Sequence, residues 1–399
     1  MTTESRLKAL LHSDSAGGIV LLAAAAVALA WANSPWAATY QALWHVGLTL
    51  PGTSLRPDLH FLINDGLMTL FFFVVGLEVR RELHDGTLAD RRQATLPLIA
   101  ALGGILLPAG IYLLANQDPA ALPGWAVPTA TDIAFAVGVL ALLGKRVPPG
   151  LRVLLLAIAI IDDIAAILII AFVYSDGVSL LGLGISAGGI LGVLGLQRLG
   201  VWRPLVYVLP GAMIWVGLLQ AGIHPVVDGV IVGLLTPAVP NPAPGARGDP
   251  RAPVVWLQER LHGWSTFLVM PLFALANAGV SIAGNPLGTD LARNIFTGVL
   301  LGLVLGKPIG ILVASWLAER LGLITLPAGV TWSGFAVISC LAGIGFTMSI
   351  FIGSLGFDDG ALLDAVKLGV LAASAVAAVL GLGMGAMLLR AESRAGERL

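Results

Sequence analysis

Long apolar stretches separated by short polar segments run along almost the whole chain. An α-helix needs about 20 mostly apolar residues to cross the hydrocarbon core of a bilayer. By this measure the pattern predicts about twelve membrane spans. They lie near 12–32, 59–82, 95–116, 121–143, 150–174, 178–197, 204–220, 223–236, 254–283, 293–315, 326–353 and 360–388. We therefore expect an all-α membrane protein in which residues 1–399 form a single integral membrane domain.

Basic residues between the predicted spans indicate how the chain is oriented, because cytoplasmic loops carry an excess of Lys and Arg. One side of the membrane holds all 22 Lys and Arg residues except Arg56, Arg293 and Lys367, and the Lys307 that lies within a span. Both termini lie on this basic side, so we expect them, including the tail 390–399, to be cytoplasmic. A missed span would scramble the alternation, so the bias also supports the number of spans.

Only one sizeable loop, 33–58, falls on the opposite, periplasmic side. Its stretch VGLTLPGTSL alternates in polarity around Pro51-Gly52, a pattern typical of a short hairpin, although an irregular loop is equally consistent with it. The exposed edge of a hairpin can pair with a second copy. Residues 45–58 therefore give the hypothesis of a homodimer.

The composition narrows the class of protein. With 57% hydrophobic and 11% charged residues, the chain has far fewer charges than the roughly 25% of a soluble protein. A formal net charge of −1 gives no reason to expect a nucleic-acid partner. The 50 Gly residues fit close packing of helices in a bilayer. A single cysteine, Cys340, excludes an intramolecular disulfide.

Ionisable residues at membrane depth mark the candidate site. A charge at the centre of a membrane helix costs about 2.5–3.5 kcal/mol on insertion scales, so such groups face the bundle interior and pair with one another. They are Asp65, Asp132, Asp162, Asp163, Asp228 and Lys307. Successive helical residues point about 100° apart. We therefore expect one of the adjacent Asp162 and Asp163 to pair with Lys307 while the other faces an aqueous cavity.

The tandem carboxylates also suggest a chemistry. Two adjacent carboxylates titrate as a coupled unit, and their hard oxygens are ligands for a small hard cation. The same oxygens cannot hold protons and a cation together, and competition for one site is all that a cation/proton exchanger requires. The alternative is an ion pair that only fixes the register of the helices.

Two of the predicted spans are interrupted midway. One contains Pro128-Thr129-Ala130-Thr131-Asp132 and the other Gly343-Ile344-Gly345-Phe346-Thr347. Proline removes a backbone donor and glycine loosens a helix. Non-helical backbone at membrane depth is tolerated only where it is buried in protein or lines a cavity.

Each interruption lies in the middle member of a group of three spans, 3–5 and 10–12, and the odd spacing of the groups gives them opposite orientations. Inverted repeats with paired breaks of this kind point to the binding site of a transporter. We expect the two interrupted helices to cross near the midplane. Asp132 would then offset the positive N-terminal ends of the half-helices, and Lys307 the negative C-terminal ends.

The stretches that carry these features resemble a known family. They are INDGLMTLFFFVVGLEVRREL, LPLIAALGG, PTATDIAFAVGVLALLGKRVP, LAIAIIDDIAAILIIAFVY, GIHPVVDGVIVG, PLFALANAGVS, GKPIG and CLAGIGFTMSIFI. Together they resemble the bacterial NhaA sodium/proton antiporter family over essentially the whole chain. That family is itself an established example of inverted repeats and broken helices.

The resemblance implies a secondary transporter of the bacterial inner membrane, with no enzymatic activity and no resident cofactor. It implies electrogenic exchange of sodium or lithium for more than one proton, by alternating access, in sodium and pH homeostasis. Asp163 would be the carboxylate that binds the transported cation and exchanges protons, and Asp162 its partner, paired with Lys307. Thr131 and Asp132 would line the site and compensate the charges of the helix ends. Gly343 and Gly345 would form the second helix break of the same arrangement.

The resemblance further implies activation by alkaline pH. Candidates for this response lie at the cytoplasmic ends of the second and ninth spans: Glu78, Arg81, Glu82, Glu259 and His262. The alternative is a solvated loop with surface ion pairs. Outside this set, Asp65 is a candidate site residue because it is ionisable at membrane depth. For His224, an interfacial role and a gating role both remain open. Gln258, His84 and Asp228 depart from the family pattern, and Asp228 has no assigned role.

Three other functions fit the residues less well. A sodium-coupled symporter would need a polar pocket for an organic solute, and no cluster of residues indicates one. An intramembrane aspartyl protease needs its two carboxylates on opposite sides of a water and a peptide, unlike adjacent Asp residues on one helix. A channel would be expected to carry a carbonyl-filter motif, and none is present.

Overall fold

The computed structural model describes residues 14–47, 57–144, 147–175, 177, 179–201, 203–239 and 252–396. In these ranges the regular structure is helical and no strand is formed, which confirms the expected all-α class. The contacts divide the chain into two units. Unit 1 comprises Met1–Gln41, Asp90–Ala166 and Ala274–Leu399, and unit 2 comprises Ala42–Ala89 and Ile167–Phe273.

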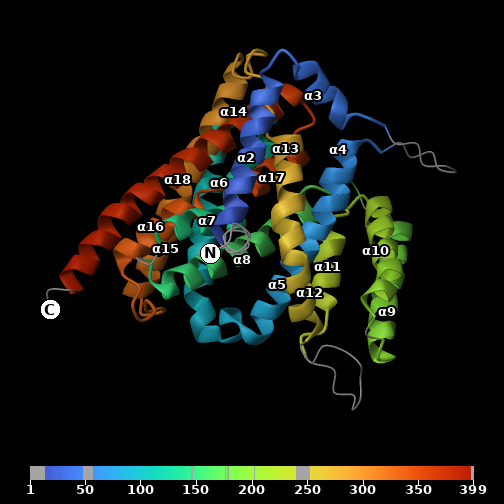
Figure 1. The fold of residues 1–399 in the computed structure, drawn as a ribbon, viewed down its shortest axis with the longest axis horizontal. Coiled ribbons are helices and arrows are strands. Elements are labelled where there is room, and N and C mark those ends of the chain that lie inside the picture. Colours follow the sequence, from blue (N-terminus) through green and yellow to red (C-terminus); the bar gives the residue numbers. More distant parts are fainter. Residues whose placement is uncertain are drawn as a thin grey trace, which may run out of the picture. The chain divides into compact units, whose positions relative to one another are not determined.

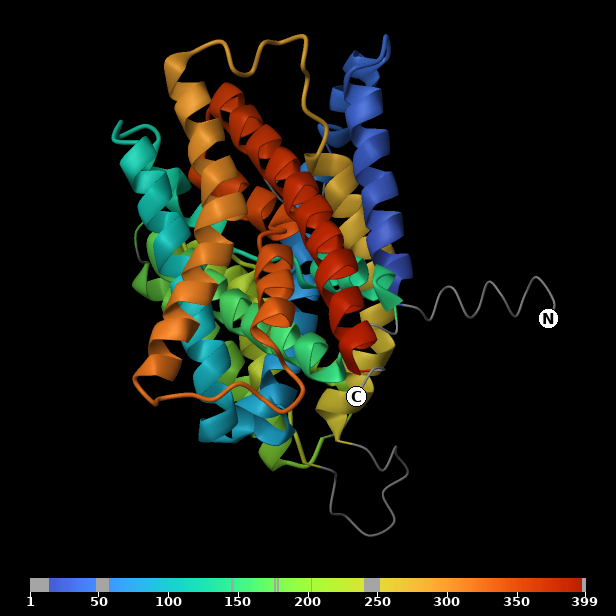
Figure 2. The ribbon, with the colours of Figure 1, turned by 90° about the vertical axis from the view of Figure 1, so that its left-hand side faces the viewer.

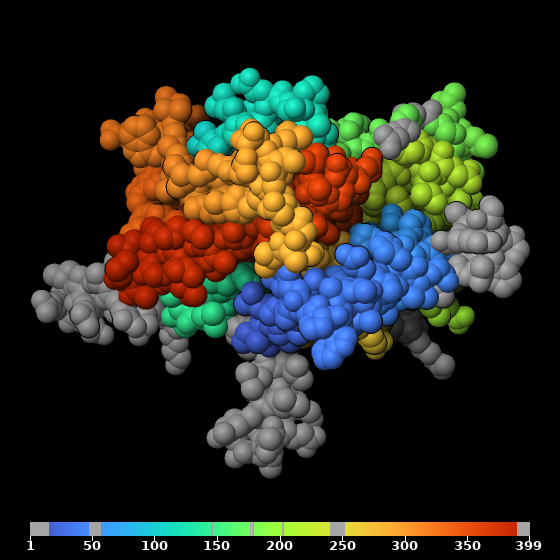
Figure 3. Space-filling model, turned by 90° about the horizontal axis from the view of Figure 1, so that it is seen from above, coloured from blue at the N-terminus to red at the C-terminus, as the bar shows by residue number. Residues whose placement is uncertain are grey.

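Unit 1 contains both groups of three predicted spans. Its elements are α2 (Asp14–Ala32), α6 (Arg91–Ala115), η3 (Leu122–Thr129), α7 (Ile133–Leu142), α8 (Pro149–Val173), α14 (Asp290–Leu301), η7 (Gly302–Gly306), α15 (Lys307–Arg320), α16 (Trp332–Ala342), α17 (Phe346–Gly356) and α18 (Gly360–Gly396). The last turns of α8 are assigned to unit 2, and the helix α3 (Ala37–Trp44) also straddles the division. Helix α14 packs beside α18, as the orange and red helices of Figure 2 and the surface in Figure 3 show.

Unit 2 contains a second set of helices. They are α4 (Leu59–Phe61), η1 (Leu62–Leu67), α5 (Met68–Asp85), η2 (Thr87–Ala89), α9 (Leu180–Arg198), η5 (Pro204–Tyr207), α10 (Val208–Ala221), α11 (Val227–Leu235), α12 (Pro253–Trp264), η6 (Ser265–Val269) and α13 (Met270–Asn277), which ends in unit 1. Helices α9 and α10 run side by side (Figure 1), and α11 packs on α5.

The described part of the chain contains fewer helices of membrane-spanning length and apolar composition than the twelve spans that the sequence predicts. Among the described residues, eight helices are long and apolar enough to cross a membrane. The number rises to ten if the bent pairs α2 with α3 and α16 with α17 each form one span. One difference is the predicted span 223–236, where helix α11 has only 9 residues, about half of what a bilayer requires. The other is 254–283, which consists of α12, η6 and α13 in succession. Twelve spans therefore stays a prediction.

Small residues allow α6 and α15 to cross in unit 1. A Cβ atom at Gly103 would lie 2.2 Å from the carbonyl oxygen of Gly310, and one at Gly310 would lie 2.1 Å from that of Gly103. Only glycine at both positions permits this approach of the two backbones. Lys307 lies one turn before Gly310, and a Cβ at Gly104 would lie 3.7 Å from Lys307 Cγ. The crossing therefore fixes where the lysine enters the interior.

The predicted hairpin at 45–58 lies mostly outside the described residues. At its base, Gly47 and Asp58 form an isolated antiparallel bridge. The Asp58 carboxylate accepts a hydrogen bond from the Phe61 N–H at 2.8 Å and lies 3.0 Å from His45 Nδ1. Partial burial opposes ionisation of Asp58, but the Phe61 N–H and the neighbouring His45 and His60 lower its pKa overall. The carboxylate therefore caps the helix that begins at α4.

Candidate functional site

The two helix interruptions meet inside unit 1. The first is 130–132, between η3 and α7, and the second is 343–345, where α16 and α17 are bent by 42°. The Asp132 N–H donates to the carbonyl oxygen of Ile344 at 2.7 Å. The Thr131 hydroxyl lies 2.8 Å from the carbonyl oxygen of Ala342. Each break thus supplies hydrogen-bond partners for backbone groups that the other leaves outside a helix.

Asp132 lies at the N-terminal ends of two half-helices. Its Oδ1 accepts from the Phe135 N–H at 3.0 Å, at the start of α7. Its Oδ2 accepts from the Thr347 N–H at 3.1 Å and from the Thr347 hydroxyl at 2.5 Å, at the start of α17. The side chain is fully buried. A carboxylate here stabilises both positive helix ends, which is the position that the sequence predicts.

The side chain of Lys307 reaches the C-terminal end of η3, the half-helix that precedes the first interruption. Its ammonium is fully buried, forms an ion pair with Asp162 Oδ2 at 2.7 Å and donates to the carbonyl oxygen of Thr129. Thr129 is the last residue of η3, so the positive charge lies where carbonyl groups lack helical partners. The expected Asp162–Lys307 ion pair is therefore present.

The tandem carboxylates differ in their surroundings although both are 2% exposed. Asp162 Oδ2 is approached by Lys307 and by the Thr131 hydroxyl, which lies 2.7 Å away. Its second oxygen, Oδ1, is buried and has no hydrogen-bond partner among the described residues. The adjacent Asp163 lies within electrostatic reach of Lys307. The site can therefore accept a further positive charge, either a proton or a cation.

Several residues around the site were not singled out from the sequence. Thr129 and Thr347 hold Lys307 and Asp132, Ser349 donates to the carbonyl oxygen of Val127 at 2.7 Å, and Ser374 accepts from the Phe346 N–H at 3.1 Å. All four side chains are buried in apolar segments. Their only signal in the sequence is that each is a Ser or Thr within an otherwise apolar predicted span. Lys307 also follows directly on η7, a π-helical segment, and such segments are frequent at functional sites.

The candidates for pH response belong to unit 2, whereas Asp132, Asp162, Asp163 and Lys307 belong to unit 1. Glu78, Arg81 and Glu82 are on α5, and Glu259 and His262 are on α12, which packs against α5. Arg81 interacts electrostatically with both Glu78 and His262. Glu82 instead accepts hydrogen bonds from the backbone and hydroxyl of Thr87 at 2.7 and 2.5 Å, and so stabilises the turn after α5.

The remaining sequence candidates are also in unit 2. His224 Nε2 lies 3.5 Å from Asp65 Oδ1, and both side chains are largely buried. The structure thus brings together two residues that the sequence left separate. Gln258 is buried, and its Oε1 has no hydrogen-bond partner in the described part of the chain. Asp228 belongs to neither pair.

No group of three or more His, Cys, Asp or Glu side chains suited to a metal ion occurs within the described ranges. Asp162 and the Thr131 hydroxyl provide oxygen atoms beside Lys307, and the adjacent Asp163 lies within electrostatic reach of the lysine.

Comparisons with known proteins are consistent over the length of the chain. Residues 8–384 match the sequence pattern of the family described as Na+/H+ antiporter 1. The chain is 57% identical over 390 residues to the Na(+)/H(+) antiporter NhaA of Acidovorax sp. (strain JS42), covering 96% of this chain and 92% of that protein. It is 51% identical over 421 residues to the Na(+)/H(+) antiporter NhaA 2 of Sorangium cellulosum, covering 96% and 90%. It is 50% identical over 432 residues to the Na(+)/H(+) antiporter NhaA of Cupriavidus necator, covering 99% and 92%.

Proposed function

We propose the mechanism of this protein from the premise that the chain belongs to the Na+/H+ antiporter 1 family. Its relatives are sodium/proton antiporters, so the chain is a secondary transporter and not an enzyme. It is a multi-pass membrane protein whose substrates are sodium ions and protons. The finer steps below rest on the geometry around Asp162, Asp163 and Lys307.

We propose that sodium and protons compete for the tandem carboxylates. The observation that carries this is the fully buried Asp162–Lys307 ion pair with Asp163 beside it. With all three groups ionised, the site has one negative charge that is not balanced. An uncompensated buried charge is strongly unfavourable, so either a proton or a cation must occupy the site. The same argument admits lithium, which is also a small hard cation.

Thr131 supports such an exchange because its hydroxyl has one proton and two nearby acceptors. It can donate to Asp162 Oδ2 or to the Ala342 carbonyl oxygen, but not to both at once. When Asp162 is ionised, donation to the carboxylate is favoured. When Asp162 is protonated, the hydroxyl can turn to Ala342 and accept from the acid. Protonation would thereby change a hydrogen bond between the two helix breaks.

We propose an electrogenic cycle with alternating access. Exchange of more than one proton per sodium requires a second titrating group, for which Lys307 and Asp162 are candidates. The two groups of three predicted spans, formed by the elements from α6 to α8 and from α14 to α18, are proposed to be inverted repeats whose interrupted members cross near the midplane. Hydrogen bonds between the breaks support this arrangement, and rearrangement about them would expose the carboxylates to each side in turn.

We propose that alkaline pH activates transport through the groups on α5 and α12. The electrostatic links of Arg81 to Glu78 and His262 support this role, because a change in protonation of either partner alters the balance around the arginine. We also propose a bacterial inner membrane location with both termini cytoplasmic. A homodimer through 45–58 is proposed as well, and single cysteines placed in that stretch should cross-link two copies.

Asp163→Asn tests the proposed mechanism in inside-out vesicles that hold a proton gradient. Sodium or lithium added to vesicles with the wild-type protein should collapse the gradient, more strongly as pH rises from about 6.5 to 9, and potassium should not. The variant should lose essentially all of this response, because an amide neither ionises nor carries the charge that attracts a cation.

The control is Asp290→Asn, which removes a carboxylate whose side chain is 91% exposed and paired with Arg293. Its flux should match the wild type. Wild-type flux from Asp163→Asn would contradict the proposed role of Asp163. No response of the wild type to any cation, from folded protein, would favour a sodium-coupled symporter instead.

A further inference from the structure

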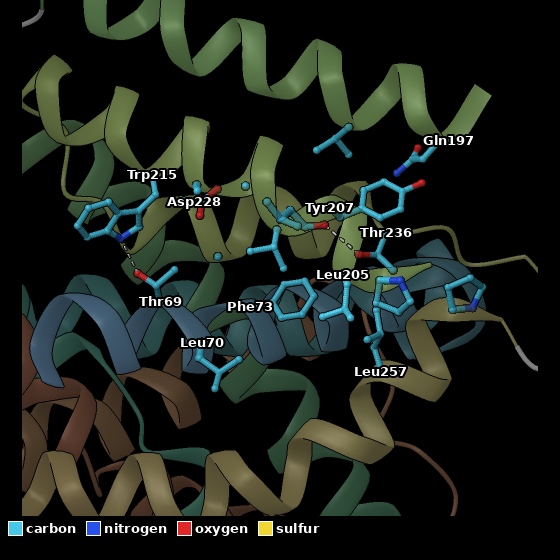
Figure 4. Close-up of a pocket in the computed structure, with 18 of the residues that line it drawn as sticks. Thr69, Leu70, Phe73, Gln197, Leu205, Tyr207, Trp215, Asp228, Thr236 and Leu257 are labelled. Atoms are coloured by element: carbon cyan, nitrogen blue, oxygen red, sulfur yellow. Dashed lines mark hydrogen bonds between the residues drawn. The ribbon is translucent and has the colours of Figure 1, made fainter. Parts of the chain in front are cut away.

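A cavity of ≈ 580 Å³ is formed by residues that all belong to unit 2. Its walls come from η1, α5, α9, η5, α10, α11 and α12, and most of the side chains are apolar. The polar side chains among them are Thr69, Gln197, Tyr207, Trp215, Asp228 and Thr236 (Figure 4). None of the described lining residues is Lys, Arg or His.

Five of these polar side chains already donate hydrogen bonds within the protein. Trp215 Nε1 donates to Thr69 Oγ1 at 3.2 Å, and Thr69 Oγ1 donates to the carbonyl oxygen of Asp65 at 2.5 Å. The other three also donate to main-chain carbonyl oxygens: Tyr207 OH to Val201 at 2.7 Å, Gln197 Nε2 to Leu235 at 2.7 Å and Thr236 Oγ1 to Val232 at 2.9 Å. These groups shape the wall and leave the sixth, Asp228, as the exception.

Asp228 is a carboxylate held at the wall of this cavity. It is 6% exposed, and its buried Oδ1 has no hydrogen-bond partner in the described structure. It occupies the first turn of α11. The next residue, Gly229, brings α11 against α5 so closely that a Cβ there would lie 2.2 Å from the carbonyl oxygen of Thr69. The carboxylate is therefore fixed near Thr69 and Trp215, as Figure 4 shows.

The cavity favours a cation but is unsuited to a small inorganic one. A carboxylate in apolar surroundings stays ionised only beside a positive partner, and no basic side chain among the described lining residues supplies one. A small metal ion would lose its water and gain a single carboxylate, far fewer than the six or more oxygen ligands that hard divalent cations take up. An organic cation loses little hydration and gains contact with the apolar walls. Aromatic rings of Trp215, Tyr207 and Phe73 add attraction for such a cation.

We propose that this cavity binds an amphipathic organic monocation, with its ammonium group against Asp228 and its apolar body along the cavity. This site uses none of the residues assigned above to sodium and proton exchange. It also gives Asp228, which departs from the family pattern, a role as the residue that selects for positive charge.

Binding of benzyltrimethylammonium to the full-length protein in lipid nanodiscs tests this site by equilibrium dialysis. The wild type should bind the cation saturably, and its neutral carbon isostere 2,2-dimethylpropylbenzene at least tenfold more weakly. Asp228→Asn should weaken binding of the cation at least tenfold and leave binding of the isostere unchanged. The control Asp290→Asn removes an exposed carboxylate from unit 1 and should bind the cation like the wild type.

A second variant fills the cavity without touching the carboxylate. A Cβ atom at Gly211 would have a single neighbour within 4 Å, Val232 Cγ2 at 4.0 Å, so Gly211→Leu has room for its side chain in the cavity. It should abolish binding of both probes. Unchanged binding of the cation by Asp228→Asn or by Gly211→Leu would overturn the proposal. Equal binding of both probes by the wild type would also overturn it, and would indicate an apolar cavity occupied by lipid chains.

Discussion

At the scale of single residues, the site is governed by the difficulty of burying charge. Lys307 is completely buried and is balanced by Asp162 at 2.7 Å and by the carbonyl oxygen of Thr129. The Coulomb attraction of such a pair offsets the loss of hydration only when the remaining donors and acceptors are satisfied. Asp162 Oδ1 has no such partner in the described chain. The pair therefore leaves one buried acceptor unsatisfied, and a buried ion pair of this kind contributes little net stability while it is intact.

Lys307→Ala tests this balance through stability. Removing the ammonium leaves Asp162 buried without its counter-charge and Thr129 without its donor, so we expect a loss of about 3–5 kcal/mol in the free energy of unfolding. Thermal unfolding of purified protein measures the change. Asp162→Asn added to Lys307→Ala removes the stranded charge and should recover part of the loss. Wild-type stability of Lys307→Ala would show that the ammonium does not balance a buried charge on Asp162.

At the scale of the elements, close helix crossings set the position of the site. Helix α15 can present Lys307 to Asp162 only because Gly103 and Gly310 let α6 and α15 touch through their backbones. Membrane helices lack a strong hydrophobic drive to associate with one another, so such packing decides their arrangement. The interrupted helices depend on each other in the same way, since Asp132 caps both α7 and α17.

Gly103→Ala tests the crossing with a matched control on the same helix. The added Cβ would meet the carbonyl oxygen of Gly310 at 2.2 Å, so the helices must separate, at a cost of about 1–3 kcal/mol in stability and with reduced transport. Gly110→Ala on α6 meets nothing within 4 Å, and should be neutral or stabilising by up to about 1 kcal/mol, because alanine favours the helix. Equal effects of the two variants on thermal unfolding would contradict the proposed crossing.

At the scale of the whole molecule, the path of the chain through the bilayer depends on the bent pair α16 and α17. The pair α16 and α17 passes the test for a span only as a unit, with its 42° bend at 343–345. A bent pair of this kind is either one interrupted span or a re-entrant loop. The alternation of basic residues along the sequence favours a span, with the loop before α16 cytoplasmic and the loop after α17 periplasmic.

Cysteine labelling in intact cells distinguishes these possibilities. Cys340 is the one cysteine of the sequence, so Cys340→Ser gives a suitable background for Thr325→Cys and Asp358→Cys, both at exposed positions. A membrane-impermeant maleimide should label Asp358→Cys directly and Thr325→Cys only after the membrane is opened. Labelling of both positions from the same side would mean that α16 and α17 form a re-entrant loop.

The sequence by itself determined the helical membrane class, the two interruptions, and the group Asp162, Asp163 and Lys307 within which the ion pair forms. These follow from local properties, because apolar length, Pro and Gly in a span, and an ionisable residue at membrane depth each leave a mark in the chain. The resemblance of the motifs then indicated the antiporter family, which the match over residues 8–384 confirms.

Only the tertiary structure shows, by its geometry, that Asp162 is the carboxylate that pairs with Lys307. It alone also shows which polar groups support the site. Thr129, Thr347 and Ser374 act through contacts between segments far apart in the chain, and no local pattern specifies such contacts. The same holds for the pairing of Asp65 with His224 and for the cavity at Asp228. The physical reason is that the length and polarity of a membrane helix depend on its own residues. The neighbours of each buried side chain depend instead on the helices packed around it.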